Sequence, residues 1–175
     1  DSERERRFLF ELGIGPGVVF VAERYRDAAD SGDDDGDMRL PLHTHAVLGY
    51  AVRPDLYGIL IADSTAQVEI DLVEGSMASV RLYGAGARFI PEAGGWVYGG
   101  HLGVALVEAG TESSLAGTPL GGSDTEESDT GFGIGGVVGY DFAKRRTGFS
   151  FLAGLGANVG IAGGDAIASG SIFGS

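Results

Sequence analysis

Large apolar residues occupy every second position along most of this chain, and glycine or alanine fills many of the positions between them. In the segment 131–143 the apolar set is Phe132, Ile134, Val138, Tyr140 and Phe142. A period of two residues is that of a β-strand, in which successive side chains point to opposite faces. The chain is therefore expected to be all-β.

The alternation recurs in eight segments, most of them about ten residues or more in length, which is enough to cross a membrane as a tilted strand. In one of them the apolar set changes parity, from Tyr57, Ile59 and Ile61 to Val68 and Ile70. Such a change predicts a β-bulge. The eight predicted strands lie near residues 8–22, 40–53, 56–70, 78–90, 95–109, 131–143, 148–159 and 165–174.

The connections between the predicted strands alternate in length. Long polar loops lie near residues 23–39 and 110–130, whereas the links near 53–56, 91–95 and 143–147 are short. Long loops at one end and tight turns at the other are typical of an antiparallel up-and-down barrel. All 175 residues are expected to form one such eight-stranded domain.

Aromatic residues gather near the short-turn ends of the predicted strands. Rings of this kind collect where hydrocarbon meets lipid headgroups, so the pattern predicts a transmembrane barrel with a membrane-interface belt. A water-soluble barrel would instead need a polar outer face. The predicted belt consists of Phe8, Phe10, Tyr50, Tyr57, Phe89, Trp96, Tyr98, Tyr140, Phe142, Phe149, Phe151 and Phe173.

The other face of the strands is mostly glycine and alanine, with few polar side chains to fill the barrel. Small residues would leave the interior underfilled, and empty space is costly. We therefore expect a flattened or plugged barrel with no wide continuous pore. The polar residues predicted to point inward are Glu11, His43, His45, Arg81, His101 and Asp141.

Strand number, loop alternation and aromatic belt together resemble the small eight-stranded outer-membrane barrels of diderm bacteria, typified by the OmpA membrane domain and OmpX. The resemblance extends over essentially the whole chain. It implies location in the bacterial outer membrane, with residues 1–7 and the short turns in the periplasm and the long loops outside. The implied partners are outer-membrane lipid, lipopolysaccharide and other envelope proteins.

Charge and composition exclude several classes of function. The net charge of −13 argues against binding to nucleic acid, which requires a basic surface. The absence of cysteine excludes disulfide scaffolds, cysteine nucleophiles and thiolate metal sites.

Three short sequence patterns resemble functional sites, but each has a simpler interpretation. Gly131, Gly133 and Gly136 match a dinucleotide-binding glycine pattern, but the following residues continue a strand instead of opening a helix. The acidic run at 30–38 lacks the ligand spacing of a calcium loop. A metal or proton-relay role for His45 and His101 is weighed against a simpler one, in which the histidines are hydrogen-bonded polar residues of the interior. No metal, cofactor or catalytic residue is therefore predicted.

The expected role is non-enzymatic: a structural or interacting barrel that displays acidic loops outside the cell, alone or as a subunit of an envelope assembly. A narrow pore or a carrier of a small apolar ligand is the alternative. A lipid-A-modifying enzyme is less favoured, because the serines at 113 and 114 are far in sequence from any histidine.

Overall fold

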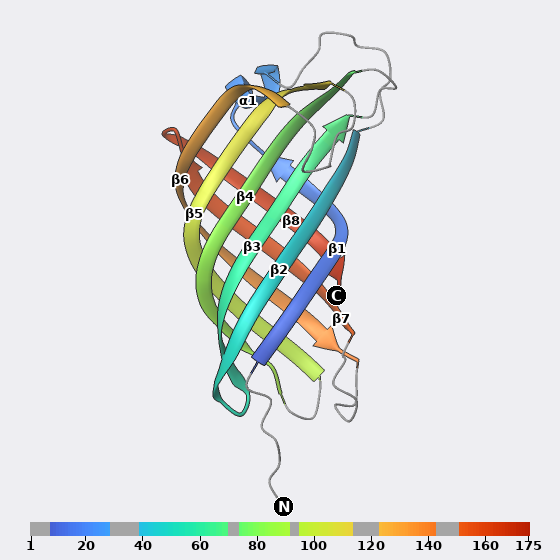
Figure 1. The fold of residues 1–175 in the computed structure, drawn as a ribbon, viewed down its shortest axis with the longest axis vertical. Coiled ribbons are helices and arrows are strands. Elements are labelled where there is room, and N and C mark those ends of the chain that lie inside the picture. Colours follow the sequence, from blue (N-terminus) through green and yellow to red (C-terminus); the bar gives the residue numbers. More distant parts are fainter. Residues whose placement is uncertain (1–7, 29–38, 70–73, 92–94, 114–122, 143–150) are drawn as a thin grey trace, which may run out of the picture.

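The computed structural model describes residues 8–28, 39–69, 74–91, 95–113, 123–142 and 151–175. Its strands form one closed antiparallel barrel in which each strand pairs with the next and the last pairs with the first (Figure 1). The predicted all-β, eight-stranded fold is confirmed. The elements are β1 (Phe8–Phe20), α1 (Glu23–Ala28), β2 (Arg39–Arg53), β3 (Leu56–Glu69), β4 (Glu74–Phe89), β5 (Gly95–Ser113), β6 (Ser123–Asp141), β7 (Leu152–Ala162) and β8 (Asp165–Gly174).

The strand register shows how tightly the barrel is wound. A path of directly paired residues that leaves β1 at Phe10 and crosses every strand returns to β1 at Phe20, ten residues further along. A stagger of this size across eight strands requires the strands to tilt by about 35–45° from the barrel axis. A barrel of eight strands is just wide enough for side chains to fill it.

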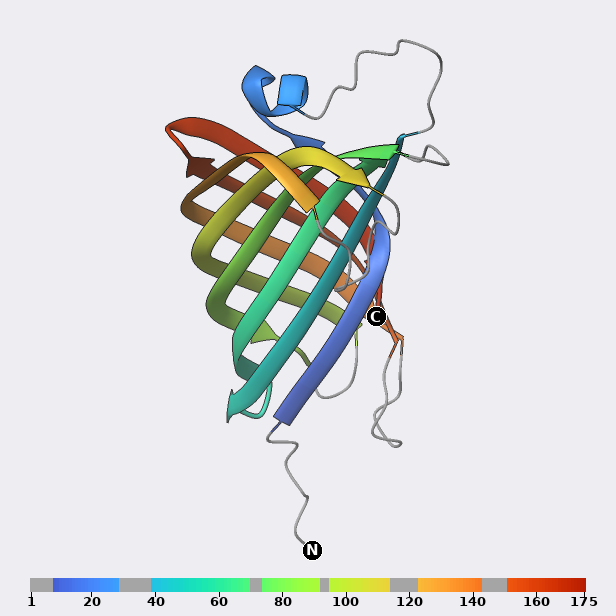
Figure 2. The same cartoon turned by 45° about the horizontal axis from the view of Figure 1, so that its top comes forward.

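At the long-loop end of the barrel, the strand boundaries differ from the predicted ones. The helix α1 lies above the barrel mouth at this end (Figures 1 and 2). The region 110–130 was predicted to be loop, but β5 continues to Ser113 and β6 already begins at Ser123. Part of the loop predicted at 23–39 is the helix α1. Residues 1–7 and the centres of both long loops lie outside the described residues.

The hairpin between β7 and β8 closes through Gly163 and Gly164, whose φ angles are +56° and +89°. A two-residue turn with both central residues at positive φ matches the right-handed twist of the paired strands, and glycine adopts it without strain. This turn lies at the same end of the barrel as α1 (Figure 2).

The outer surface of the barrel is apolar. Leu102 is 70% exposed and Phe132 is 81% exposed, and Leu12, Leu48, Ile134 and Leu155 are each more than half exposed. So large an apolar surface is not found on proteins surrounded by water, and it is the surface that lipid chains require. Within the described residues, no helix has both the length and the apolar character to cross a membrane.

Most of the predicted belt aromatics lie on this outer face. Trp96 packs edge-on against Tyr140 with ring centroids 5.6 Å apart, and Tyr140 packs similarly against Phe142 at 5.0 Å. Phe149 lies outside the described residues. The exposed members are Phe8, Phe10, Tyr50, Phe89, Trp96, Tyr98, Tyr140, Phe142 and Phe151.

Two predicted belt members, Tyr57 and Phe173, instead point into the barrel and are 5% and 4% exposed. The bulge predicted in this part of the chain does not occur, because β3 pairs with β4 without interruption from Leu56 to Val68. The register shift lies instead on β2, between Ala51 and Arg53 beside the tight turn. Both predictions for β3, the outward Tyr57 and the bulge, were wrong because the same alternate residues point inward along the whole described strand.

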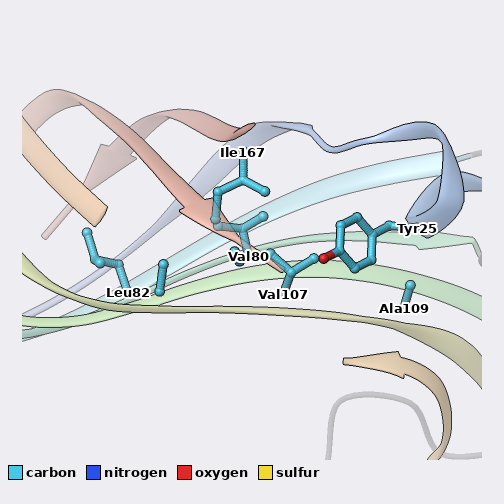
Figure 3. Packing of buried hydrophobic residues seen from close by; sticks show 8 residues of the cluster. Tyr25, Val80, Leu82, Val107, Ala109 and Ile167 are labelled. Atoms are coloured by element: carbon cyan, nitrogen blue, oxygen red, sulfur yellow. The ribbon is translucent and has the colours of Figure 1, made fainter. Parts of the chain in front are cut away.

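The barrel interior is filled in three layers. Near the short-turn end lies an apolar cluster that includes Val47, Tyr57, Ile59, Leu152 and Phe173. Near the long-loop end a second cluster surrounds Tyr25 of α1 (Figure 3). Polar residues occupy the space between the two. Among the described residues the expected underfilling does not occur, since large side chains that were predicted on the outer face, such as Tyr57 and Phe173, fill space beside the glycines.

Candidate functional site

The polar layer between the two apolar clusters contains all three histidines of the chain. It is built from inward-facing positions of seven strands. His43 and His45 lie two residues apart on β2 and therefore share a face. Its members are Glu11, His43, His45, Asp63, Thr65, Arg88, His101, Asn158 and Ser169.

Glu11 joins three strands in this layer. Its Oε1 atom lies 2.8 Å from Nε2 of His45, and its Oε2 atom accepts a hydrogen bond of 2.6 Å from Nη1 of Arg88. The Arg88 side chain is 1% exposed and that of Glu11 is 11% exposed. Because both charges are buried, each depends on the other for its compensation.

The two histidines of β2 are themselves hydrogen-bonded. Nε2 of His43 lies 3.2 Å from Nδ1 of His45, and Nδ1 of His43 lies 3.0 Å from Oγ1 of Thr65. The Phe173 ring covers His45 edge-on, with centroids 4.4 Å apart. The pair is thereby enclosed between hydrogen-bond partners at its ends and an aromatic ring at its side.

Asn158 of β7 organises the other half of the layer. Its amide nitrogen donates to Oδ1 of Asp63 at 3.0 Å and to Oγ of Ser169 at 3.2 Å. Its Oδ1 atom lies 3.2 Å from Nε2 of His101. Asn158 thus links β7 to β3, β5 and β8 through side-chain hydrogen bonds across the interior.

Glycine makes room for these rings. A Cβ atom on Gly13 would fall within the imidazole of His45, which is its direct partner across the β1–β2 pair. A Cβ atom on Gly135 would overlap Oδ1 of Asn158 and the ring of His101. At these two positions the absence of a side chain is a packing requirement of the polar layer.

The helix α1 closes the mouth above the second apolar cluster. Tyr25 is fully buried there, and its hydroxyl donates to Oδ2 of Asp129 at 2.7 Å (Figure 3). Burial and this hydrogen bond raise the pKa of Tyr25 to about 12, so the phenol stays protonated at neutral pH. Arg24 pairs with Asp129 at 3.0 Å and with Asp165 at 2.8 Å, which fastens α1 to β6 and β8.

Of the six residues predicted to point inward, the structure places five in the interior and one on the outer face. Glu11, His43, His45, His101 and Asp141 lie in the interior. Arg81 does not: it lies on the outer face, one-third exposed, and pairs with Glu108 at 3.0 Å. The two histidines that were weighed as a metal or proton-relay pair have separate hydrogen-bond partners: Glu11 and His43 for His45, and Asn158 for His101.

Sequence reasoning missed five members of the layer: Asp63, Thr65, Arg88, Asn158 and Ser169. A signal existed for Arg88. Phe89 was correctly placed on the outer face, and the neighbouring position on a strand must face the other way. The same parity rule, counted from the outward-facing Leu155, places Asn158 inside. Its contact with Asp63 across the barrel has no local signal in the sequence.

The side chains of the polar layer are hydrogen-bonded mainly to one another. The described residues contain no group of three or more side chains suited to hold a metal ion. A cavity of about 10 Å³ lies beside Leu82, Ala105 and Ile167, which is scarcely the space of one water molecule. This cavity, lined by described residues, is too small for a small-molecule ligand.

No protein-family model and no curated protein matches the sequence. Solved structures do match the fold. One is Ail, the attachment invasion locus protein of Yersinia pestis, in complex with the heparin analogue sucrose octasulfate, with a TM-score of 0.59 and 16% identity over 94% of this chain and 95% of that one. A second structure of Ail gives a TM-score of 0.56 and 13% identity over 96% of each chain. The chain therefore has the closed eight-stranded barrel fold of Ail, which resembles that of the small OmpX-like outer-membrane barrels.

Proposed function

We propose that this protein is a non-enzymatic integral barrel of the bacterial outer membrane that acts through its loops. In this proposal residues 1–175 form one barrel domain, with residues 1–7 and the short turns in the periplasm. The long loops near 23–39 and 110–130 face the outside of the cell. The carrying observation is an apolar outer wall around an interior that is filled in all its described layers.

The filling of the described interior favours this role over a pore or a carrier. A pore requires a continuous polar passage, whereas the described interior has an apolar cluster on each side of its polar layer. A carrier requires a cavity far larger than about 10 Å³. What remains for recognition is the surface at the loop end, where exposed Glu127 and half-buried Asp129 lie on β6.

The charge of the chain indicates what those loops bind. The related fold of Ail was captured with a sulfated sugar, which is a polyanion. This chain carries a net charge of −13, with acidic runs at 33–35 and 124–129 in or beside the predicted loops. Repulsion should exclude polyanions and attract cationic protein surfaces, or divalent cations that bridge to lipopolysaccharide. Other envelope proteins with basic faces fit the same description.

Orientation is tested by labelling single cysteines, which the natural chain lacks. Ser128→Cys lies at the loop end and Pro54→Cys in the β2–β3 turn, and both positions are exposed. A membrane-impermeant maleimide added to intact cells should label the first and reach the second only after the outer membrane is opened. Labelling of Pro54→Cys alone in intact cells would show that the barrel has the opposite orientation in the membrane.

Binding is tested with purified barrel in lipid nanodiscs. Immobilised polylysine should retain the protein at low salt and heparin should not, while replacement of Asp33, Asp34 and Asp35 by asparagine should weaken retention. Equal retention on both supports, or retention on heparin alone, would contradict an acidic recognition surface. Stepwise ionic conductance in planar bilayers would contradict the closed interior.

A further inference from the structure

The contacts of His43 and His45 determine which ring nitrogens carry protons. The chain of contacts runs from Thr65 through His43 and His45 to Glu11, at 3.0, 3.2 and 2.8 Å. The Glu11 carboxylate is paired with Arg88 and can only accept hydrogen bonds. Nε2 of His45 must therefore be the donor to Glu11.

The remaining assignments follow in order. A neutral imidazole carries one N–H, so Nδ1 of His45 accepts and Nε2 of His43 donates to it. Nδ1 of His43 then accepts, and the donor is the hydroxyl of Thr65. At neutral charge both rings carry their proton on Nε2, and every hydrogen bond in the chain points toward Glu11.

This direction leaves one position for an additional proton. A proton on Nδ1 of His45 would face the N–H of His43, unless the proton of His43 moved from Nε2 to Nδ1. In either arrangement the nitrogen that is newly protonated is Nδ1 of His43. A proton on Nδ1 of His43 meets no such conflict, because the Thr65 hydroxyl can turn and accept. Oδ1 of Asp63 lies 3.6 Å from this nitrogen and supplies a countercharge.

The charged surroundings favour a positive charge on the pair, since a carboxylate lies near each of its two ends. Besides the pair itself, the titratable and charged groups of the described interior are Tyr25 of α1, Glu11 of β1, Tyr57 and Asp63 of β3, Arg88 of β4, His101 of β5 and Asp141 of β6. Arg88 is committed to Glu11, and His101 is bonded to Asn158. From β7 and β8 the neighbours Asn158, Ser169 and Phe173 are uncharged. Among the ionisable groups just named, acids outnumber the single guanidinium.

We propose that the His43–His45 pair is a binding site for one proton, taken up from solvent by the lone pair of His43 Nδ1 and held against Asp63. Uptake forms one N–H bond on His43 and breaks one O–H bond of the hydronium ion that supplies the proton, which leaves as water. It replaces the Thr65 donor with an ion pair, so that acid changes how β2 is tied to β3. This inference is independent of what the loops bind.

The site is tested by nitrogen-15 NMR of the whole chain in micelles, labelled at its three histidines. Two variants assign the signals to individual histidines. The His101→Gln variant removes the signals of His101, and the Glu11→Gln variant should shift the Nε2 signal of His45, which contacts Glu11. At about pH 8 both rings of the pair should show protonated Nε2 and bare Nδ1. On acidification to about pH 4, Nδ1 of His43 should gain a proton. A bare Nε2 in either ring at the higher pH, or an Nδ1 of His43 that stays bare on acidification, would overturn the proposal.

Two variants test the role of each neighbour of His43. Asp63→Asn keeps the shape of the side chain and removes its charge, so His43 should no longer charge over this pH range. Glu108→Gln removes a carboxylate on the outer face and is the matched control, with no change expected. Thr65→Val should leave both Nε2 tautomers and the proton uptake in place. Uptake that is unchanged in Asp63→Asn would show that Asp63 is not the countercharge. Uptake that is lost in Thr65→Val would show that the proton depends on the hydroxyl, contrary to the proposal.

Discussion

Gly13 on β1 and His45 on β2 are direct partners in the strand register, and the imidazole of His45 occupies the space that a side chain on Gly13 would need. This relationship explains the alternation of bulky residues with glycine. The glycine face surrounds the rings and long side chains of neighbouring strands, and the interior is close-packed as a result.

Gly13→Ala should therefore destabilise the barrel. The added methyl group must displace the His45 ring from Glu11, at a cost of about 1–3 kcal/mol in the free energy of unfolding. Gly100→Ala is the matched control, because the nearest atom to its Cβ would be 3.8 Å away. Urea unfolding in micelles measures both. Equal stability of the two variants would mean that the His45 ring does not depend on the glycine.

The buried Glu11–Arg88 pair predicts a strong asymmetry between single and double substitution. Glu11→Gln leaves the Arg88 guanidinium buried without a countercharge and should cost about 3–5 kcal/mol. The double variant Glu11→Gln with Arg88→Met removes both charges and should lose less than the sum of the two single variants. Additive losses in urea unfolding would indicate that the two side chains do not interact.

Tyr25 predicts an alkaline limit to the docking of α1. Its pKa in the folded chain is about 12, above the ordinary value of 10.0, so the neutral phenol is favoured by the folded state. The stabilisation is complete below about pH 10 and is lost as the pH rises through about 12. A spin label at Glu23→Cys should become mobile over this window.

Tyr25→Phe is the control for this transition. It keeps the ring in the apolar cluster and removes the titrating hydroxyl, so the label at position 23 should show no such transition. The lost hydrogen bond to Asp129 should cost about 0.5–1.5 kcal/mol. A transition of equal size in Tyr25→Phe would assign it to another group.

The periodicity of the sequence predicts the strands and the barrel because a two-residue repeat has one structural meaning. Errors arose where parity was not carried through a strand. Arg81 and Phe89 are eight residues apart on β4 and must share a face, yet one was assigned inward and the other outward. Applying parity from Phe89 would have moved Arg81 to the outer face and found Arg88 inside.

Other parts of the site lie beyond sequence reasoning. The contact between Glu11 and His45 follows from the β1–β2 register, which the long connection between these strands does not determine. The contact between Asn158 and Asp63 joins residues 95 positions apart across the barrel interior. It depends on the stagger of all eight strands, which no local pattern determines.

Spin labels at Leu102→Cys and Val107→Cys test the central claim, a lipid-facing wall around a closed interior. Both positions lie on β5, but Leu102 is 70% exposed and Val107 is fully buried. In lipid bilayers the label at position 102 should be relaxed by dissolved oxygen and shielded from a water-soluble nickel chelate, and the label at 107 should be shielded from the chelate. Access of the chelate to position 102 would contradict a membrane-embedded wall, and its access to position 107 would show an open, water-filled barrel.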